Sequence, residues 1–151
     1  MNIDFKIRKG KIEDLEIIVD NNIKMAEETE GKRLDYNTVR KGVENALKDP
    51  EKGEYYVVES KGRIVGQLMI TKEWSDWRNC NFLWAQSVYT LPEFRGRGIF
   101  SSLFNYVEKI AKKNFCCGLR LYVDKHNEKA LKVYKKLGMI ESDYLFIEKE
   151  F

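Results

Sequence analysis

Two glycines and two arginines alternate in the stretch Arg95–Ser101, which precedes the amphipathic run Ile99–Lys113. Glycine adopts backbone angles that other residues resist, so such a turn can bring successive N–H groups close to a ligand. At the start of a helix, these N–H groups and the helix dipole favour an anion, and arginine adds positive charge. The stretch therefore predicts either a phosphate-binding turn or a plain strand-to-helix connection with solvated arginines.

Other ligand-binding motifs fit this stretch less well. The Gly-Lys-Ser/Thr of a Walker loop is missing, and so is the third glycine of a dinucleotide-binding fingerprint. Arg-Gly strings that bind RNA come in disordered repeats, whereas this one is single and embedded. The formal net charge is only +3, from 27 basic and 24 acidic residues, which argues against nucleic acid and membrane partners.

The elements around the turn predict one mixed domain over residues 1–151. A length of 151 residues with 43% hydrophobic residues suits a single globular core. Hydrophobic periodicity indicates a strand, two helices, three antiparallel strands, a helix, a strand, a helix and a final strand. The turn would link the strand Asn81–Tyr89 to the helix Ile99–Lys113. The last two elements would be the helix Asn127–Leu137 and the strand Tyr144–Phe151. The predicted fold class is α/β (α+β).

The cysteines and the N-terminus bear on the compartment. Cys80, Cys116 and Cys117 are odd in number and contain no Cys-x-x-Cys. Adjacent Cys116 and Cys117 would point to opposite faces of a strand, so we expect no disulfide framework and a reducing compartment. The stretch Met1–Lys11 has no long apolar run, which argues against a signal peptide and a membrane span. These features predict a cytoplasmic protein. No cluster has the spacing of a metal site.

Two separated segments carry a resemblance to a known family. Gln86-Ser87-Val88-Tyr89, then Pro92, then Arg95-Gly96-Arg97-Gly98-Ile99 resemble the acetyl-CoA signature of the GNAT superfamily of N-acetyltransferases, Arg/Gln-x-x-Gly-x-Gly/Ala. Phe100 stands at the last position, where a small residue is usual. The segments Tyr122–Ala130 and Val133–Met139 continue the resemblance, which covers nearly the whole chain. It implies a mixed, mostly antiparallel sheet flanked by helices, with a splayed central strand pair.

The resemblance also implies acetyl-CoA as the cofactor. The strand before the turn would bind the pantetheine arm through free backbone groups, and the turn would hold the pyrophosphate. Asn127 would contact the cofactor, cap its helix, or do both. Tyr134 would protonate the departing thiolate, unless it is a core aromatic residue. The candidate cofactor-binding residues are Ser87, Val88, Tyr89, Arg95, Gly96, Arg97, Gly98, Ile99, Phe100, Ser101, Asn127 and Tyr134.

The resemblance implies transfer of the acetyl group to a primary amine of a small molecule or a lysine-like acceptor, which needs a base. The strand Asn81–Tyr89 holds no acid, so the base is sought elsewhere. The candidates are Glu28, which we favour together with Tyr134 as the catalytic pair, and Glu30, Glu73, Asp76 or bulk water. The candidate substrate-binding residues are Glu28, Glu30, Trp74 and Trp77. Acidic side chains attract a cation and tryptophan faces hold one, although acidic runs are also common in solvated loops and tryptophans in cores.

Two functions stay open on the sequence. One is an acetyl-CoA-dependent N-acetyltransferase. The other is a non-catalytic acyl-CoA-binding or sensor domain, which the absence of a strand acid favours. Exposed aromatic residues and edge strands are also compatible with a homodimer.

Overall fold

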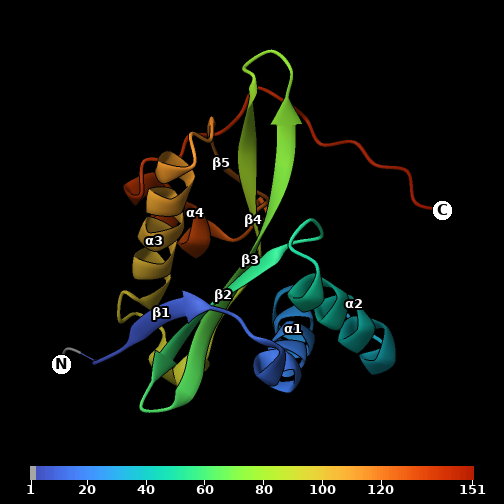
Figure 1. Ribbon diagram of the computed structural model, residues 1–151, viewed down its shortest axis with the longest axis vertical. Coiled ribbons are helices and arrows are strands. Elements are labelled where there is room, and N and C mark those ends of the chain that lie inside the picture. The colour runs from blue at the N-terminus through green and yellow to red at the C-terminus, as the bar shows by residue number, and fades with distance from the viewer. Residues whose placement is uncertain (1–2) are drawn as a thin grey trace.

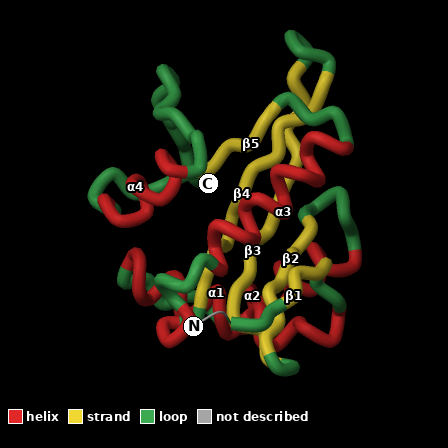
Figure 2. The backbone as a smooth tube through the Cα atoms, turned by 90° about the vertical axis from the view of Figure 1, so that its left-hand side faces the viewer, coloured by secondary structure: helices red, strands yellow, loops and turns green. Residues whose placement is uncertain are grey.

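Five strands form a single sheet in the order β1-β2-β3-β4-β5, with helices on both of its faces (Figures 1 and 2). The structure is a computed structural model that describes residues 3–151, so Met1 and Asn2 lie outside the described residues. The strands are β1 (Lys6–Lys9), β2 (Glu54–Ser60), β3 (Arg63–Ser75), β4 (Cys80–Thr90) and β5 (Gly118–Leu121). The α-helices are α1 (Leu15–Glu30), α2 (Tyr36–Lys48), α3 (Ile99–Lys113) and α4 (Glu128–Lys136), and two 3-10 helices are η1 (Ile12–Asp14) and η2 (Pro92–Phe94).

Neighbouring strands run antiparallel from β1 to β4, whereas β5 runs parallel to β4. The parallel step requires a crossover, and α3 supplies it. This mixed, mostly antiparallel sheet with flanking helices confirms the predicted fold class. Within residues 3–151, every helix is too short or too polar to span a bilayer.

Local capping sets the ends of the first two helices where the sequence predicted them. Gly31 has a φ of 61° and closes α1 with its N–H directed at the carbonyls of the last turn. The Asp35 carboxylate accepts a hydrogen bond from the Thr38 N–H at 2.8 Å and so caps the start of α2.

The core lies in two layers, one on each face of the sheet. Buried side chains of α1 and α2 pack against one face, and those of α3 pack against the other. The first layer includes Leu15, Ile18, Val19, Val43, Ala46, Tyr55, Val57 and Ile64. The second includes Tyr56, Val58, Val65, Leu68, Ile70, Leu83, Ile99, Leu103 and Val107.

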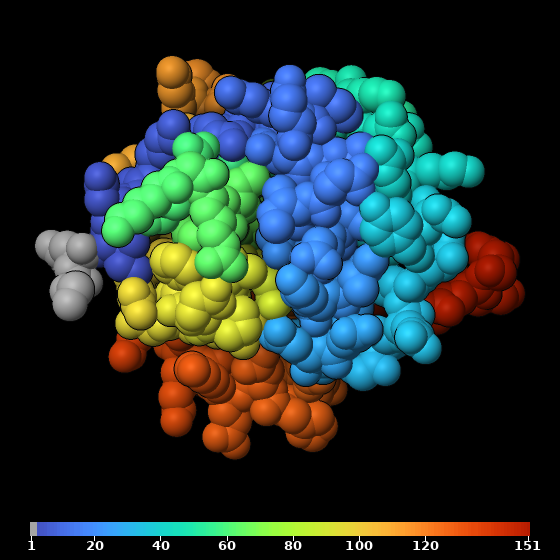
Figure 3. Space-filling model, turned by 90° about the horizontal axis from the view of Figure 1, so that it is seen from below, coloured from blue at the N-terminus to red at the C-terminus, as the bar shows by residue number. Residues whose placement is uncertain are grey.

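The start of α3 is anchored tightly on the sheet. Ile99 is 2% exposed and packs over Gly66 of β3, where an added Cβ would lie 2.9 Å from the Ile99 Cγ2. Just before it, Arg95–Gly98 is exposed. Seen from below in Figure 3, the turn after β4 (yellow) lies at the surface between α1 (blue) and the segment leading to α4 (orange). The anchored helix therefore presents an accessible turn.

The final strand predicted at Tyr144–Phe151 is absent, and that prediction is wrong. All eight residues are exposed and form neither strand nor helix. In Figure 1 this segment (red) leaves the body of the molecule. The alternating apolar pattern favours a strand, but a strand forms only where another strand accepts its hydrogen bonds. No other segment within residues 3–151 pairs with this one.

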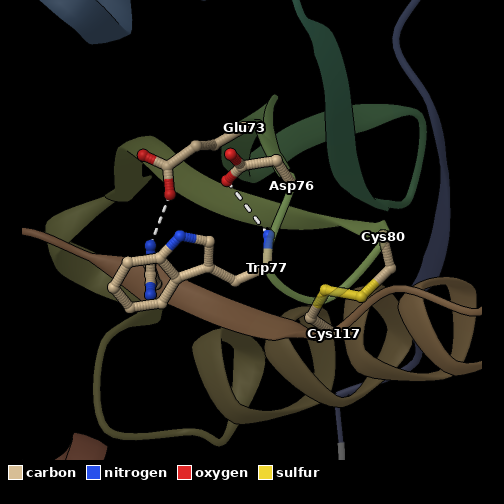
Figure 4. The surroundings of a disulfide bond; sticks show 6 residues. Glu73, Asp76, Trp77, Cys80 and Cys117 are labelled. Atoms are coloured by element: carbon tan, nitrogen blue, oxygen red, sulfur yellow. Dashed lines mark hydrogen bonds and ion pairs between the residues drawn. A yellow bond between two sulfur atoms is a disulfide. The ribbon is translucent and has the colours of Figure 1, made fainter.

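The expectation of unpaired cysteines is also wrong, because Cys80 and Cys117 form a disulfide (Figure 4). Cys80 begins β4 and Cys117 immediately precedes β5, so the parallel pairing of these strands brings the two Cα atoms within 5.7 Å. The Cys117 N–H also donates to the Asn81 carbonyl at 2.8 Å. The argument from adjacent Cys116 and Cys117 did not include this third, distant partner. Cys116 is the free thiol.

Reducing the disulfide should destabilise the fold. The Cys80–Cys117 bridge closes a loop of 37 residues, and the chain-entropy argument gives a loss of about 2–4 kcal/mol when it is absent. We expect Cys80→Ser with Cys117→Ser to lower the free energy of unfolding in urea by that amount. Cys116→Ser, which changes the free thiol, is the matched control. Equal stability of the double variant and the control would contradict the expectation.

Candidate functional site

Strands β4 and β5 pair over only part of the length of β4. Their parallel pairing runs from Phe82 with Gly118 to Ala85 with Leu121. Beyond this point β4 continues through Gln86–Thr90, but within the described chain no strand pairs with it on that side. The two strands therefore part midway along β4, as predicted. The free backbone edge falls on the predicted residues Ser87, Val88 and Tyr89.

A bulge distorts β4 at the point where the strands part. Pairing with β3 moves from Gln67 with Tyr89 to Met69 with Gln86, so β4 carries an extra residue between these pairs. Ser87 has a φ of 50°, in the left-handed region that is unusual for a residue with a side chain. Bulges often re-aim the backbone beside active sites. This one redirects the strand edge that faces away from β3.

A buried amide network supports the bulge from the other side of the sheet. Gln67 of β3 is fully buried; its Nε2 donates to the Asn22 Oδ1 at 2.9 Å and its Oε1 accepts from the Asn21 Nδ2 at 3.0 Å. The same Nε2 lies 3.4 Å from the Ser87 carbonyl. Asn22 also donates to the Tyr55 hydroxyl at 3.1 Å. Helix α1 is thus connected to the backbone of the bulge.

The turn before α3 carries unused backbone donors. Gly96 and Gly98 have φ values of 72° and 75°, which L-residues with side chains rarely adopt. No acceptor within residues 3–151 bonds to the N–H groups of Gly96–Ser101, and the Ser102 N–H is the first in the helix to bond, to the Gly98 carbonyl at 3.0 Å. Such donors at a helix start suit an anion.

Glu28, at the end of α1, is bonded to this turn. Its carboxylate accepts from the Arg95 Nη2 at 2.6 Å and from the Tyr89 hydroxyl at 2.8 Å. Burial acts to raise the pKa of Glu28, but the hydrogen bonds from Arg95 and Tyr89 outweigh it and hold that pKa below its usual range. Burial, followed by the bond to Glu28, raises the pKa of Tyr89 to about 12. Glu28 is therefore an ionised acceptor that fixes Arg95.

The structure brings Tyr134 of α4 next to the first turn of α3. Its ring meets the Phe100 ring edge-on, with 5.5 Å between centroids, a favourable aromatic geometry. Burial raises the pKa of Tyr134, so its phenol keeps its proton at neutral pH. Asn127 caps α4 by accepting from the Ala130 N–H at 3.1 Å. The capping role considered for Asn127 is thus present.

An open cavity of about 310 Å³ lies where β3 and β4 meet the end of β5. It is lined by Thr71, Lys72, Glu73, Trp84, Gln86 and Tyr122. The Trp84 and Tyr122 rings are 4.5 Å apart between centroids, and Glu73 pairs with Arg120 of β5. The cavity thus combines aromatic walls with a carboxylate, next to the residues where β4 and β5 part.

The predicted substrate-binding residues fall into two separate groups. Glu28 and Glu30 lie at the end of α1, beside the turn that follows β4. Trp74 and Trp77 lie at the β3–β4 hairpin, next to the first residue of β4, and Trp77 is 85% exposed. An 11-residue strand is roughly 35 Å long, so the structure does not bring these groups together in one small pocket.

Comparison with known proteins agrees with this geometry. The sequence profile of the Acetyltransferase (GNAT) family matches residues 18–139. The chain belongs to this family. Thialysine N-epsilon-acetyltransferase of Bos taurus is 35% identical over 75 residues, which are 50% of this chain and 44% of that protein. The match to this curated relative thus spans less than half of its length.

Solved structures extend the GNAT likeness to the whole fold. The crystal structure of a possible acetyltransferase from Clostridium difficile 630 is 47% identical, with a TM-score of 0.91 over 97% of each chain. A predicted acetyltransferase from Clostridium acetobutylicum, crystallised with acetyl-CoA, has a TM-score of 0.79 at 19% identity over 96% of each chain. The second likeness concerns the fold alone.

Sequence analysis missed several residues of this GNAT site. It described Asn22 only as a polar interruption of an apolar stripe, and it did not single out Asn21 or Gln67. Full burial of Gln67 and Asn21 could not be deduced before α1 was placed on β3. The polar residues in otherwise apolar runs were the available signal, since buried amides usually pair with one another. The contact of Phe100 with Tyr134 was equally hidden.

The amide network yields a test of stability. Gln67→Leu should leave the Asn21 and Asn22 amides buried without their partner, at a cost of roughly 1–3 kcal/mol per group. The free energy of unfolding measures the loss. Gln86→Leu is the matched control, because Gln86 is only half-buried and its bond to the Thr71 hydroxyl, at 2.6 Å, can be replaced by water. A smaller loss for Gln67→Leu than for the control would refute the assignment.

Proposed function

We propose that this protein transfers the acetyl group of acetyl-CoA to a primary amine of a small molecule or a lysine-like acceptor. One observation supports this most directly. The free edge of β4 at Ser87–Tyr89 leads within a few residues to the unused N–H groups of Gly96–Ser101. A pantetheine amide needs strand-like hydrogen bonds, and a pyrophosphate needs convergent donors. The chain presents both in the order in which the cofactor carries them.

The residues fit acetyl-CoA as follows. The N–H groups of Gly96–Ser101 donate to the pyrophosphate, with Arg97 adding charge at the rim. The edge of Ser87–Tyr89 pairs with the pantetheine arm and orients it toward α4. Asn127 caps α4 and so fixes the helix that carries Tyr134. When bound, acetyl-CoA supplies an activated thioester; the protein supplies binding, orientation and proton transfer.

Tyr134 is proposed as the general acid. Its pKa is raised by burial, so the phenol is neutral and can donate its proton to the departing thiolate. The Phe100 ring restricts where the Tyr134 ring can lie. Phe100, which departs from the usual small residue, is thus proposed to position the acid.

For the base, the chain offers Glu28 and Glu73. Glu28, the base predicted from sequence, is held by Arg95 and Tyr89, and its lowered pKa makes it a weak base near neutral pH. Glu73 lines the cavity beside Trp84. We therefore propose that Glu73, directly or through one water, accepts the proton of the amine, and that Glu28 positions Arg95.

The acceptor is proposed to enter the cavity lined by Glu73, Trp84 and Tyr122. Aromatic faces and a carboxylate attract an ammonium group, and the name of the bovine relative, a thialysine acetyltransferase, supports a primary amine at the end of a flexible chain. Glu30, Trp74 and Trp77 lie outside this cavity lining, and a role for them in amine binding stays a prediction.

Removing the Tyr134 hydroxyl should slow the reaction. With a panel of primary amines and acetyl-CoA, Tyr134→Phe should lower kcat by about 10²-fold or more, while calorimetry shows little change in the Kd for coenzyme A. Tyr106→Phe, at another tyrosine near α3's partly exposed face, is the control. Binding of acetyl-CoA without release of free thiol for any amine would instead support a non-catalytic sensor.

The two carboxylates can be told apart by pH profiles. We expect Glu73→Gln to lower kcat by about 10²-fold and to flatten the acidic limb of the kcat profile. Glu28→Gln should mainly raise the KM for acetyl-CoA, because it releases Arg95. If Glu28→Gln removed the acidic limb and Glu73→Gln did not, Glu28 would be the base and the assignment of Glu73 would fall.

A further inference from the structure

The C-terminal segment Tyr144–Phe151 carries large apolar side chains with little to cover them. Each of Tyr144, Leu145, Phe146, Ile147 and Phe151 is more than half exposed, and Ile147 is 86% exposed. A stretch of this kind is costly in water and usually marks an interaction surface. Figure 1 shows it extending from the body as a free arm.

Strand β5 offers the matching surface. It is the last strand of the sheet, and within the described residues its outer side has no strand partner. All four residues of β5 are only half-buried, whereas most residues of β2 and the first half of β3 are buried. An uncovered edge of this kind pairs readily with another extended segment.

We propose that Tyr144–Phe151 of one copy of this chain adds as a strand to the outer edge of β5 in a second copy, and that the exchange is reciprocal. The segment touches its own molecule where the Phe146 ring meets the Tyr122 ring, 4.8 Å apart between centroids, just past the end of β5. After Phe146 the chain continues outward, and Ile147 and Phe151 stay exposed. An arm that leaves its own sheet edge in this way is placed to reach another.

Charge favours the same arrangement over pairing between two arms. The arm and the residues before it carry Glu141, Asp143, Glu148 and Glu150 against Lys149 alone. The region from β5 to the end of α4 is mostly basic, with Arg120, Lys125, Lys129, Lys132, Lys135 and Lys136 against Asp124 and Glu128. Two arms would repel each other, whereas an arm and the β5–α4 region of the second copy attract.

The area is sufficient for a stable dimer. An aromatic residue buries about 150–250 Å², and each arm has three of them together with Leu145 and Ile147. Two reciprocal arms therefore exceed the roughly 1,200 Å² at the lower end of specific interfaces. The exchange also has two-fold symmetry, so it closes and does not propagate into a filament.

The mass in solution tests the proposal without reference to activity. The full chain should sediment as a dimer, at twice the 17.9 kDa of one chain. Ile147→Asp should convert it to a monomer, because it places a charge on the buried arm. Ile12→Asp, at an exposed isoleucine in η1, is the matched control and should leave the dimer intact. A monomeric full chain, or a dimer unaffected by Ile147→Asp, would overturn the proposal.

Hydrogen exchange separates exchange of arms from other kinds of dimer. The β5 amides on the outer edge should be protected in the full chain and should lose that protection in Ile147→Asp. A chain ending at Asp143 serves as a second variant and should be monomeric with the same exposed β5 amides; circular dichroism reports whether each variant is folded. A monomer with protected β5 amides would mean that the arm folds onto its own sheet, which would also refute the proposal.

Discussion

The short pairing of β4 with β5 is the constraint on which the rest of the structure depends. Four residue pairs hold the strands together, and the disulfide between Cys80 and Cys117 closes the end at which that pairing begins. Past Ala85 the strands part, so that the backbone of β4 becomes an accessible edge inside an otherwise continuous sheet. Because a strand edge is a ready acceptor for an extended ligand, a break in pairing here has a functional use that a closed sheet would lack.

Helix α1 supports both halves of the site that follows from this break. From its middle, Asn21 and Asn22 bond to Gln67, which in turn reaches the bulge at Ser87. From its end, Glu28 bonds to Arg95 in the turn before α3. A single helix therefore fixes both the β4 edge and the phosphate-binding turn. Buried polar networks of this kind favour one arrangement of the backbone, since any other leaves amides unpartnered.

The two sides of the sheet carry different chemistry. The first turn of α3 and the facing tyrosine on α4 supply donors and a neutral phenol, which suits an anionic cofactor and a leaving thiolate. The cavity beyond the end of β5 supplies aromatic rings and a carboxylate, which suits a cationic amine. The parting of β4 and β5 lies between them. In the proposed dimer the arm of the second copy would lie along β5, next to the ring of Tyr122.

The sequence by itself determined the elements and the phosphate-binding turn. Helix ends at Gly31 and Asp35 follow from local capping, and the glycines at 96 and 98 are needed for a backbone conformation that can be recognised from residue type alone. Short-range rules of this kind act within a few residues. The resemblance of the two separated segments then sufficed to predict a splayed strand pair and to place Tyr134 near the turn.

Only the tertiary structure decided which distant groups meet. Cys80 finds Cys117 because β4 and β5 begin side by side, and Gln67 becomes buried because α1 covers β3. Glu28 is bonded to Arg95 across 67 positions, which turns a predicted base into a positioning group. The segment Tyr144–Phe151 has the pattern of a strand but no partner within the described chain. Pairing, burial and charge are properties of two segments at once, and the pattern of one segment cannot fix them.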